Sequence, residues 1–158
     1  SILQEPADKF GNDPSVEMMW AVKAYEHAET YFNILISVDP TKLKLCKLDN
    51  ELYSKFRGKF KDLKIDKIVE NDIKSEEAKQ QWREFCEEFN SQVADWNMAT
   101  LLRLDSSLDV SEHNTIIVPR TQFLAIEIAR NREGLNSDLR TKYSPKRIKD
   151  SNNEPTEK

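Results

Sequence analysis

The chain has 158 residues, of which 38% are hydrophobic and 33% are charged, and its formal net charge is −4. This length fits one domain with tails, and the low hydrophobic content indicates that part of the chain lies outside a packed core. The negative net charge argues against binding of a nucleic-acid backbone by the chain as a whole, and no apolar run is long enough for a membrane-spanning helix.

The first helix is predicted to begin at Pro14, after a flexible arm at residues 1–12 that shows little periodicity. Asp13 and Pro14 are typical of an N-cap and a first helical residue. Apolar residues then follow two helical stripes, one with Met18, Val22, Tyr25, Ala28, Phe32, Leu35 and Ile36, and one with Trp20, Ala24, His27 and Tyr31. Two stripes indicate burial on two sides, or burial on one side and a binding surface on the other.

A second helix is predicted from Asp49, with an apolar stripe of Leu52, Phe56, Phe60 and Leu63. Its other face is basic and carries Lys55, Arg57, Lys59, Lys61, Lys64 and Lys67. Basic residues beside aromatic rings can form a nucleic-acid platform, but these rings fall on core spacing, so a solvated basic face is favoured. Residues 65–74 are predicted to be a connection.

The clearest amphipathic helix follows Ser75, which can cap it ahead of two acidic residues. Its apolar stripe steps by three or four residues through Trp82, Phe85, Phe89, Val93 and Trp96, and both tryptophans are expected in the core. Cys86 lies beside this stripe as a small core residue. Because Cys46 and Cys86 have no metal or redox spacing, we expect free thiols in a cytoplasmic protein.

Two short apolar segments further along the chain are predicted to pair as an antiparallel hairpin, Leu101–Leu104 with Ile116–Val118, with a continued helix as the alternative. The expected fold is therefore mainly α: a compact orthogonal bundle of about four to five helices, with one short β-hairpin as an option. This helical domain is expected to occupy residues 13–136.

The strongest apolar run, Thr115–Leu135, is predicted to form a buried helix that begins at Pro119 and ends at Gly134. One polar line remains on it, together with charges at its exit: Arg120, Glu127, Arg130, Asn131 and Arg132. Charged side chains that lie between apolar side chains need ion-pair or hydrogen-bond partners. We expect Arg103 and Asp105 from the hairpin to pair with Glu127 and Arg120.

Two interpretations of this polar line stay open. In the first, Glu127 pairs with Arg130 or Asn131 along the helix, and the line is structural. In the second, part of the line binds a partner protein, because arginine between apolar side chains is common at binding hot spots. We expect Arg120 and Glu127 to be mainly structural, and Arg130 and Arg132 to be mainly binding. The candidate partner-binding residues are Arg103, Asp105, Arg120, Gln122, Glu127, Arg130, Asn131 and Arg132.

Residues 137–158 form a polar tail with five basic residues and no acidic residue between Leu139 and Lys149, and the tail is predicted to be disordered and dispensable for folding. The chain has three glycines and no glycine-rich phosphate loop, catalytic motif or metal cluster, and His27 and His113 lie far apart. We therefore expect a binding protein with no catalytic residue, no cofactor and no metal.

Several sequence blocks are similar to those of a known family: Gly11–Pro14 with Trp20–Ala21, His27–Tyr31, Ser37–Pro40, Lys79–Arg83, Thr100–Asp105 and Pro119–Gly134. In these blocks the chain resembles the polysaccharide biosynthesis domain-containing protein 1 family. The last block is long and specific, and the resemblance covers residues 10 to 136, which is most of the chain.

The resemblance implies a mainly helical, cytosolic, ATP-independent chaperone that binds the unfinished GTP-binding domain of translation elongation factor 1-alpha and assists its folding. It also implies action at the ribosome with the nascent polypeptide-associated complex. We expect a monomer that does not contact membranes. The alternatives are a polysaccharide-modifying, methyltransferase-like enzyme, which the missing cofactor loop does not support, and an RNA-binding adaptor that uses the basic helix around residues 55–67.

Overall fold

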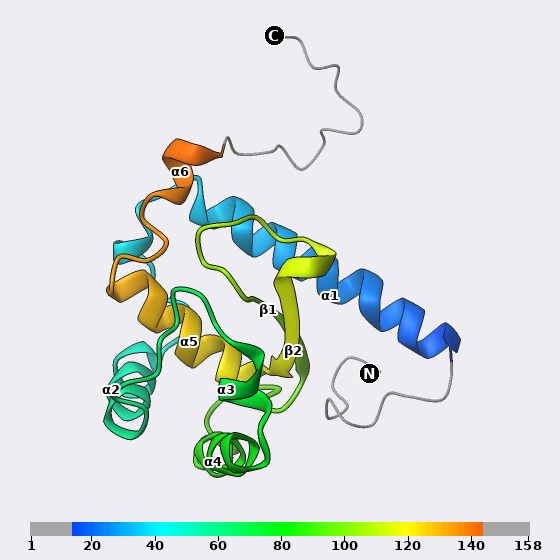
Figure 1. Ribbon diagram of the computed structural model, residues 1–158, viewed down its shortest axis with the longest axis vertical. Coiled ribbons are helices and arrows are strands. Elements are labelled where there is room, and N and C mark those ends of the chain that lie inside the picture. The colour runs from blue at the N-terminus through cyan, green and yellow to red at the C-terminus, as the bar shows by residue number, and fades with distance from the viewer. Residues whose placement is uncertain (1–13, 144–158) are drawn as a thin grey trace, which may run out of the picture.

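The computed structural model describes residues 14–143 and is mainly helical, with four main helices and one two-stranded hairpin, as predicted (Figure 1). The main helices are α1 (Pro14–Leu35), α2 (Asp49–Lys59), α4 (Glu76–Glu87) and α5 (Arg120–Arg132). Shorter helical segments are η3 (Pro40–Lys42), α3 (Glu70–Lys74), η4 (Glu112–Asn114) and α6 (Leu139–Lys142). The strands are β1 (Ala99–Arg103) and β2 (Thr115–Pro119).

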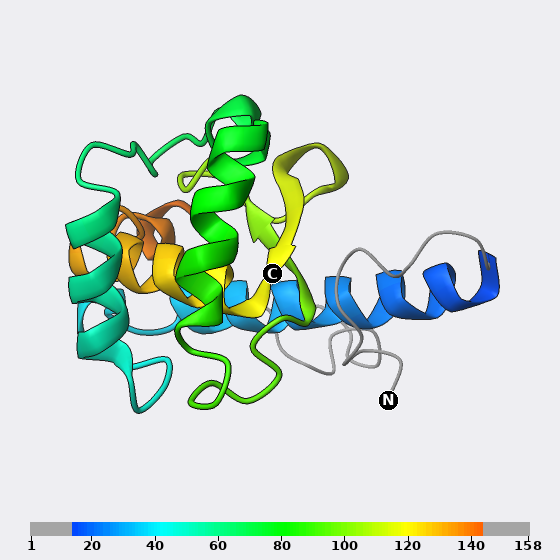
Figure 2. The same ribbon diagram turned by 90° about the horizontal axis from the view of Figure 1, so that it is seen from below.

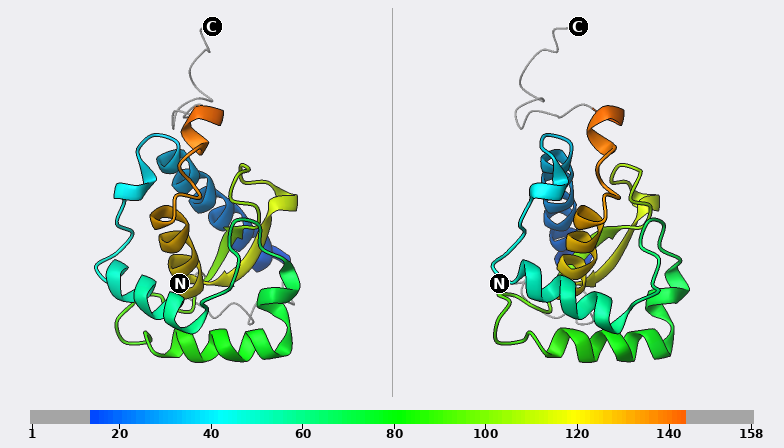
Figure 3. Two further views of the ribbon diagram at one scale, coloured as in Figure 1. Left: turned by 60° about the vertical axis from the view of Figure 1, so that its left-hand side comes forward. Right: turned by 90° about the vertical axis from the view of Figure 1, so that its left-hand side faces the viewer.

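Helix α5 lies at the centre of the fold, with α1 on one side and α2 and α4 on the other (Figures 2 and 3). Every residue from Thr121 to Asn131 is buried, so the helix has no solvent face. The predicted ending at Gly134 is confirmed, because this residue has a φ of +81°. The amide of Leu135 donates to the Arg130 carbonyl at 2.8 Å, which satisfies a carbonyl at the helix end. The start differs by one residue, because Pro119 belongs to β2 and precedes the first turn.

The predicted hairpin is confirmed. Strands β1 and β2 pair in antiparallel register, with Ala99 opposite Pro119 and Arg103 opposite Thr115. The sheet has two strands in the part of the chain that the structure describes, and β1 packs against α1. Because β2 leads directly into α5, the hairpin also determines where α5 begins.

Neither predicted apolar stripe of α1 is buried along its whole length, because the buried side passes from the second stripe to the first. Trp20 and Ala24 pack against β1, and the helix is buried further along through Ala28, Phe32 and Leu35. The first stripe departs from the expected burial in its first half, where Met18 and Val22 are 68% and 53% exposed, and Met19 beside them is 58% exposed. This half of α1 extends beyond the rest of the fold (Figure 2), so it has no neighbouring element to bury its outer side. Asp13, the predicted N-cap, lies outside the described residues.

Aromatic side chains from α2, α4 and the residues just after each helix pack against one another. The Phe60 and Trp82 rings stack with their centres 4.3 Å apart, and Phe56, Phe85 and Phe89 pack around them. Ser75 caps α4 as predicted, accepting a hydrogen bond from the Ala78 amide at 3.1 Å.

The predicted length of this fourth helix is wrong. Helix α4 ends at Glu87, and the apolar residues that continue its spacing lie in turns, where Val93 is buried and Trp96 is only half-buried. Turns with inward apolar side chains can mimic helical spacing over a few residues. The expected connection at residues 65–74 also differs, because it contains α3 and buries Ile65, Ile68 and Ile73.

The folded body extends beyond Asn136, so the predicted domain boundary lies too early. Residues 139–142 form α6, and Leu139 is 2% exposed. The Tyr143 ring packs edge-on against Phe32 of α1 at 5.4 Å between centres. Leu139 and Tyr143 attach this otherwise basic segment to the body. Across the described residues, none of the helices is both long and apolar enough to span a membrane.

Candidate functional site

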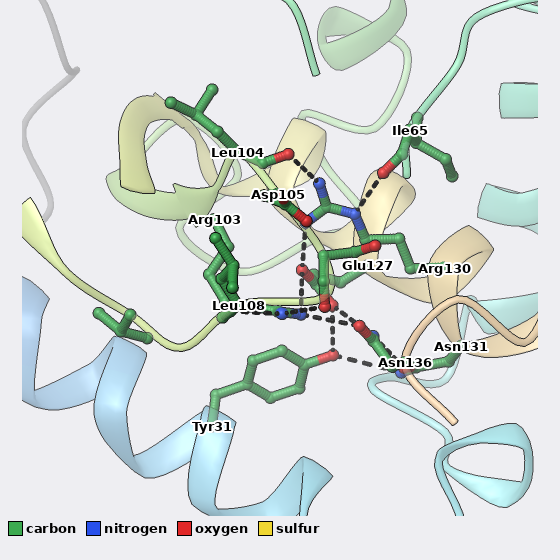
Figure 4. A network of polar contacts seen from close by, with 12 residues as sticks. Tyr31, Ile65, Arg103, Leu104, Asp105, Leu108, Glu127, Arg130, Asn131 and Asn136 are labelled. Carbon is green, nitrogen blue, oxygen red and sulfur yellow. Dashed lines mark hydrogen bonds and ion pairs between the residues drawn. The ribbon is translucent and has the colours of Figure 1, made fainter. Parts of the chain in front are cut away.

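The polar line on α5 forms the centre of a buried hydrogen-bond network around Glu127 (Figure 4). Glu127 Oε1 accepts from the Tyr31 hydroxyl at 2.9 Å and from Asn136 Nδ2 at 3.0 Å. Its other oxygen, Oε2, accepts from Arg130 Nη1 at 2.9 Å and from Arg103 Nη2 at 3.3 Å. The carboxylate is therefore bound by four donors from α1, β1, α5 and the turn after α5. The predicted pairing of Glu127 with Arg130 and Arg103 is confirmed.

Arg103 reaches this network from the end of β1 and is buried. Its Nη1 donates to the carbonyls of Ser106 and Leu108, at 2.7 and 3.2 Å, and its Nη2 donates to Asn136 Oδ1 at 2.8 Å. The guanidinium also lies over the Phe32 ring, 5.3 Å from its centre. Arg103 thus holds the loop after β1, the turn after α5 and α1 together.

Arg130 is the largest fully buried side chain, with 0% exposure. Its Nε donates to the Ile65 carbonyl at 2.8 Å, and its Nη2 donates to the Leu104 carbonyl at 3.0 Å. Both carbonyls lie in segments that are not helical. The expectation that Arg130 mainly contacts a partner is therefore corrected, because all three guanidinium nitrogens bond inside the protein.

The network holds two arginines and one carboxylate, so it carries an excess of positive charge. Four backbone carbonyls, those of Ile65, Leu104, Ser106 and Leu108, accept hydrogen bonds from the guanidinium groups and spread this charge. A buried charge is tolerated only when it is paired and hydrogen-bonded in this way. The network therefore holds α1, the segment at Ile65, β1 with the loop after it, α5 and the turn after α5 in one fixed arrangement.

Burial and charge act in opposite directions on the carboxyl group. Burial by itself would raise the pKa of Glu127, but the neighbouring Arg103 and Arg130 charges, with the hydrogen bonds from Arg130 and Tyr31, leave this pKa below its ordinary value. Burial raises the pKa of Tyr31 well above its ordinary value, and the Glu127 charge raises it further. Glu127 is thus ionised and Tyr31 neutral at neutral pH, so Tyr31 remains a hydrogen-bond donor.

Asn131 and Asn136 complete the network. Asn131 Nδ2 donates to the Tyr31 hydroxyl at 3.2 Å, and its Oδ1 accepts from Asn136 Nδ2 at 2.7 Å. Asn136 and Tyr31 were not among the predicted site residues. Tyr31 was placed on an apolar stripe, and Asn136 was the last residue of the expected domain. The hydroxyl group of Tyr31 and the position of Asn136 two residues after Gly134 were the available signals.

The predicted ion pair at the start of α5 differs in the structure. Asp105 does not pair with Arg120; its carboxylate lies 3.8 Å from Lys67 Nζ and accepts from the Ser107 amide at 2.9 Å. Arg120 lies at the first turn of α5, and its Nε is buried without a hydrogen-bond partner among the described residues.

His27 on α1 lies near Arg120. Burial lowers the pKa of His27, and the charge of Arg120 lowers this pKa further. The His27 ring packs edge-on against Phe123.

The two remaining candidates lie outside the Glu127 network. Gln122 is buried on the side of α5 that faces α4. Arg132 lies at the helix exit, where its Nη2 pairs with Asp49 at 3.2 Å and also bonds Asn50, and its guanidinium covers the Tyr53 ring. About a third of the Arg132 side chain stays exposed, so its binding role remains a prediction.

The basic face of α2 is largely occupied by internal ion pairs. Arg57 Nε lies 2.8 Å from Glu133, Lys55 lies 3.4 Å from Glu88, and Lys59 lies 3.3 Å from Glu84. These acids come from α4 and from the end of α5, which the sequence alone did not place opposite α2. A phosphate backbone would have to compete with these carboxylates, so the structure gives no support to the RNA-binding alternative.

The sequence and the fold both have relatives among known proteins. A family model described as PBDC1 protein matches residues 16–141. Protein PBDC1 of Homo sapiens is 54% identical over 134 residues, a match that covers 85% of this chain and 58% of the human protein. A homolog from Saccharomyces cerevisiae is 42% identical, and the match covers 82% of this chain and 92% of the yeast protein. A solution NMR structure of a Saccharomyces cerevisiae protein superposes with a TM-score of 0.74 at 40% identity, covering 85% of this chain and 95% of that one.

Proposed function

The chain belongs to the PBDC1 protein family, and from this premise we propose that it is an ATP-independent chaperone for the GTP-binding domain of translation elongation factor 1-alpha. The observation that carries the proposal is the exposed apolar side of α1. A chaperone of this kind must offer apolar surface that an incompletely folded domain can cover.

The first half of α1 has the properties of such a surface. Met18, Met19 and Val22 are exposed on consecutive turns of a helix whose buried side is held by Trp20 and Ala24. Methionine side chains are flexible and polarizable, so they adapt to surfaces that are not yet well packed. The exposed methionine side chains are thus flexible, whereas the opposite side of the helix is packed against the body.

Release of the client follows from differential affinity. An unfinished GTPase domain exposes apolar residues that the finished domain buries, so α1 binds the first state more tightly than the second. Completion of the client fold, with GTP bound, would then shift the equilibrium toward release. ATP independence is proposed because the sequence contains no glycine-rich phosphate-binding loop. We further propose a monomer in the cytoplasm that can act beside the nascent polypeptide-associated complex.

The rigid network around Glu127 serves this function indirectly. Tyr31 and Phe32 hold the second half of α1 to α5 and α6, which leaves the first half extended from the body. We therefore do not expect Arg103, Glu127 or Arg130 to contact the client directly.

The proposal is tested by refolding the isolated GTP-binding domain of the elongation factor and measuring its aggregation by light scattering, without ATP. The wild-type protein should suppress aggregation. A Met18→Ser, Met19→Ser, Val22→Ser variant should lose this effect while retaining its melting temperature. The matched control is Val69→Ser with Leu108→Ser, which removes exposed apolar side chains away from α1. No suppression by the wild-type protein, or equal suppression by the triple variant, would contradict the proposal.

A further inference from the structure

A groove opens between α3 and α4 on one side and the junction of β2 with α5 on the other. Its volume is about 480 Å³, which lies in the range of ligand sites. The apolar part of its wall is formed by Ile73, Trp82, Cys86, Trp96, Ile117 and Pro119. None of these residues belongs to the exposed side of α1, so the groove is a separate surface.

Two buried side chains in this wall have unused hydrogen-bond donors. Trp82 and Gln122 are each 3% exposed, and neither Trp82 Nε1 nor Gln122 Nε2 has a hydrogen-bond partner among the described residues. Both residues line the groove. Buried polar groups are nearly always paired, so each such donor calls for an explanation. Each donor atom is itself covered, with less than 1 Å² of accessible surface, so a ligand acceptor satisfies both donors when the groove wall shifts to admit it.

The charges around the groove favour an anion. Lys74, Lys79 and Arg83 line it, against a single acidic residue, Glu87. This local excess of positive charge stands on a chain whose net charge is −4. Burial lowers the pKa of Lys74, and the nearby charge of Lys79 lowers it further. An incoming carboxylate would relieve the repulsion between these two cations.

The shape of the groove favours an extended chain. It runs beside β2, which is paired only with β1 among the described residues, so its other edge borders the groove. The Ile117 carbonyl accepts from Lys74 Nζ at 2.6 Å, and the Ile117 side chain is partly exposed. A peptide can lie along a strand edge and place alternate side chains into a neighbouring pocket.

We propose that this groove binds an acidic peptide segment, in which a carboxylate accepts hydrogen bonds from Trp82 Nε1 and Gln122 Nε2 while flanking apolar residues cover Trp96 and Ile117. Lys79 and Arg83 stabilise the carboxylate from the rim. The site goes beyond the chaperone function proposed above, because it does not use α1 and does not depend on the identity of the client.

The test uses a short synthetic peptide in which glutamate alternates with leucine and isoleucine, titrated into the isotope-labelled protein. We expect the Trp82 indole and Gln122 amide proton resonances to shift as the peptide binds, and a matched peptide with glutamine in place of glutamate to bind at least about tenfold more weakly. Arg83→Glu, an exposed change, should weaken binding of the acidic peptide by a similar factor. The control Lys23→Glu makes the same charge change on α1 and should leave the affinity unchanged.

Three results would overturn the proposal. Equal binding of the glutamine peptide would show that the carboxylate is not recognised. Unchanged Trp82 and Gln122 resonances would place the peptide elsewhere. Acetate or a short single-stranded RNA that produces the same shifts at lower concentration than the peptide would assign the groove to small anions or to nucleic acid.

Discussion

Tyr31 on α1 donates a 2.9 Å hydrogen bond to Glu127 on α5, across 96 residues of sequence. This bond joins the first long helix of the fold to its central helix. Because the acceptor is a buried carboxylate, the bond is stronger than one between neutral groups.

The first prediction is that Tyr31→Phe lowers the free energy of unfolding by about 1.5 to 3 kcal/mol, the usual contribution of a hydrogen bond to a charged group. The change also leaves Asn131 Nδ2 without its acceptor. Chemical denaturation measures the loss. The matched control is Tyr25→Phe, which removes a partly buried bond of 3.3 Å to a neutral carbonyl and should cost about 1 kcal/mol or less. Equal costs for the two variants would show that the charge of Glu127 adds nothing.

The second prediction concerns Arg130, whose guanidinium group makes all its hydrogen bonds inside the protein. Arg130→Met keeps most of the side-chain volume but removes one of the four donors to Glu127, one donor to the Leu104 carbonyl and the donor to the buried Ile65 carbonyl, so we expect a loss of about 3 to 5 kcal/mol in unfolding free energy. Lys55→Met breaks an exposed pair and should change stability by less than about 1 kcal/mol. A stable Arg130→Met protein with reduced client affinity would return Arg130 to a binding role.

The third prediction is an acid-side loss of stability that depends on Glu127. Its pKa in the folded protein is lower than in the unfolded chain, where it is about 4.3. The unfolded chain therefore binds the proton more readily, so this contribution is complete above about pH 4.3 and is lost as pH falls through the lower folded pKa.

Urea unfolding at a series of pH values between about 6 and 3 measures this dependence. Glu127→Gln should be less stable at neutral pH and should show a shallower decline in acid. Asp39, Glu84, Asp105 and Glu133 also have lowered pKa values, and they contribute equally to both proteins. Parallel curves for the two proteins would contradict the prediction.

The fourth prediction concerns the thiol of Cys86. Burial raises its pKa to about 12, so almost none is present as thiolate at pH values where thiol reagents are used. In the native protein a disulfide reagent should modify Cys46, slowly because burial raises its pKa too, and should leave Cys86 intact. Cys86→Ser should therefore not change the native reaction. Mass spectrometry identifies the modified residue, and modification of native Cys86 would show that the groove opens more than the structure indicates.

The fifth prediction reverses the expectation that everything after Asn136 is dispensable. Leu139 is buried between α1 and the loop that contains Val110, so Leu139→Ala should cost about 2 to 5 kcal/mol. Arg140→Ala, its exposed neighbour, should change stability by no more than about 0.5 kcal/mol. Truncation after Asn136 should lower the melting temperature as Leu139→Ala does. An unchanged melting temperature in the truncated protein would show that α6 contributes no stability.

Much of the fold was predictable because the sequence features that indicate it depend on residues close together in the chain. The Ser75 cap, the left-handed Gly134 and the apolar segments of the hairpin each depend on neighbouring residues, and the structure contains all of them. The end of α4 was missed because the inward side chains of Phe89 and Val93 continue a helical spacing in turns. Leu139 was missed because the residues around it are basic.

The location of the charged residues in the site was predictable from the sequence, but their roles were not. The charged line on α5 could be found from helical spacing, and so could the partner Arg103, because the hairpin leads directly into α5. The roles of the arginines could not be found in this way. What decides the role of Arg130 is the pair of carbonyls at Ile65 and Leu104, and the sequence does not show where a backbone carbonyl points.

The long separation between Tyr31 and Glu127 has a consequence for biosynthesis. Translation proceeds at about 5 to 20 residues per second, so the 96 intervening residues take about 5 to 20 s to make. During that interval α1 has left the ribosomal tunnel before its partners exist, and the side chains of Phe32 and Leu35 are open to other chains. Leu139 and Tyr143 emerge last among the described residues that pack against α1. Docking of the first helix is therefore a late event in the making of this protein, and a new copy exposes apolar helix for as long as it is being synthesised.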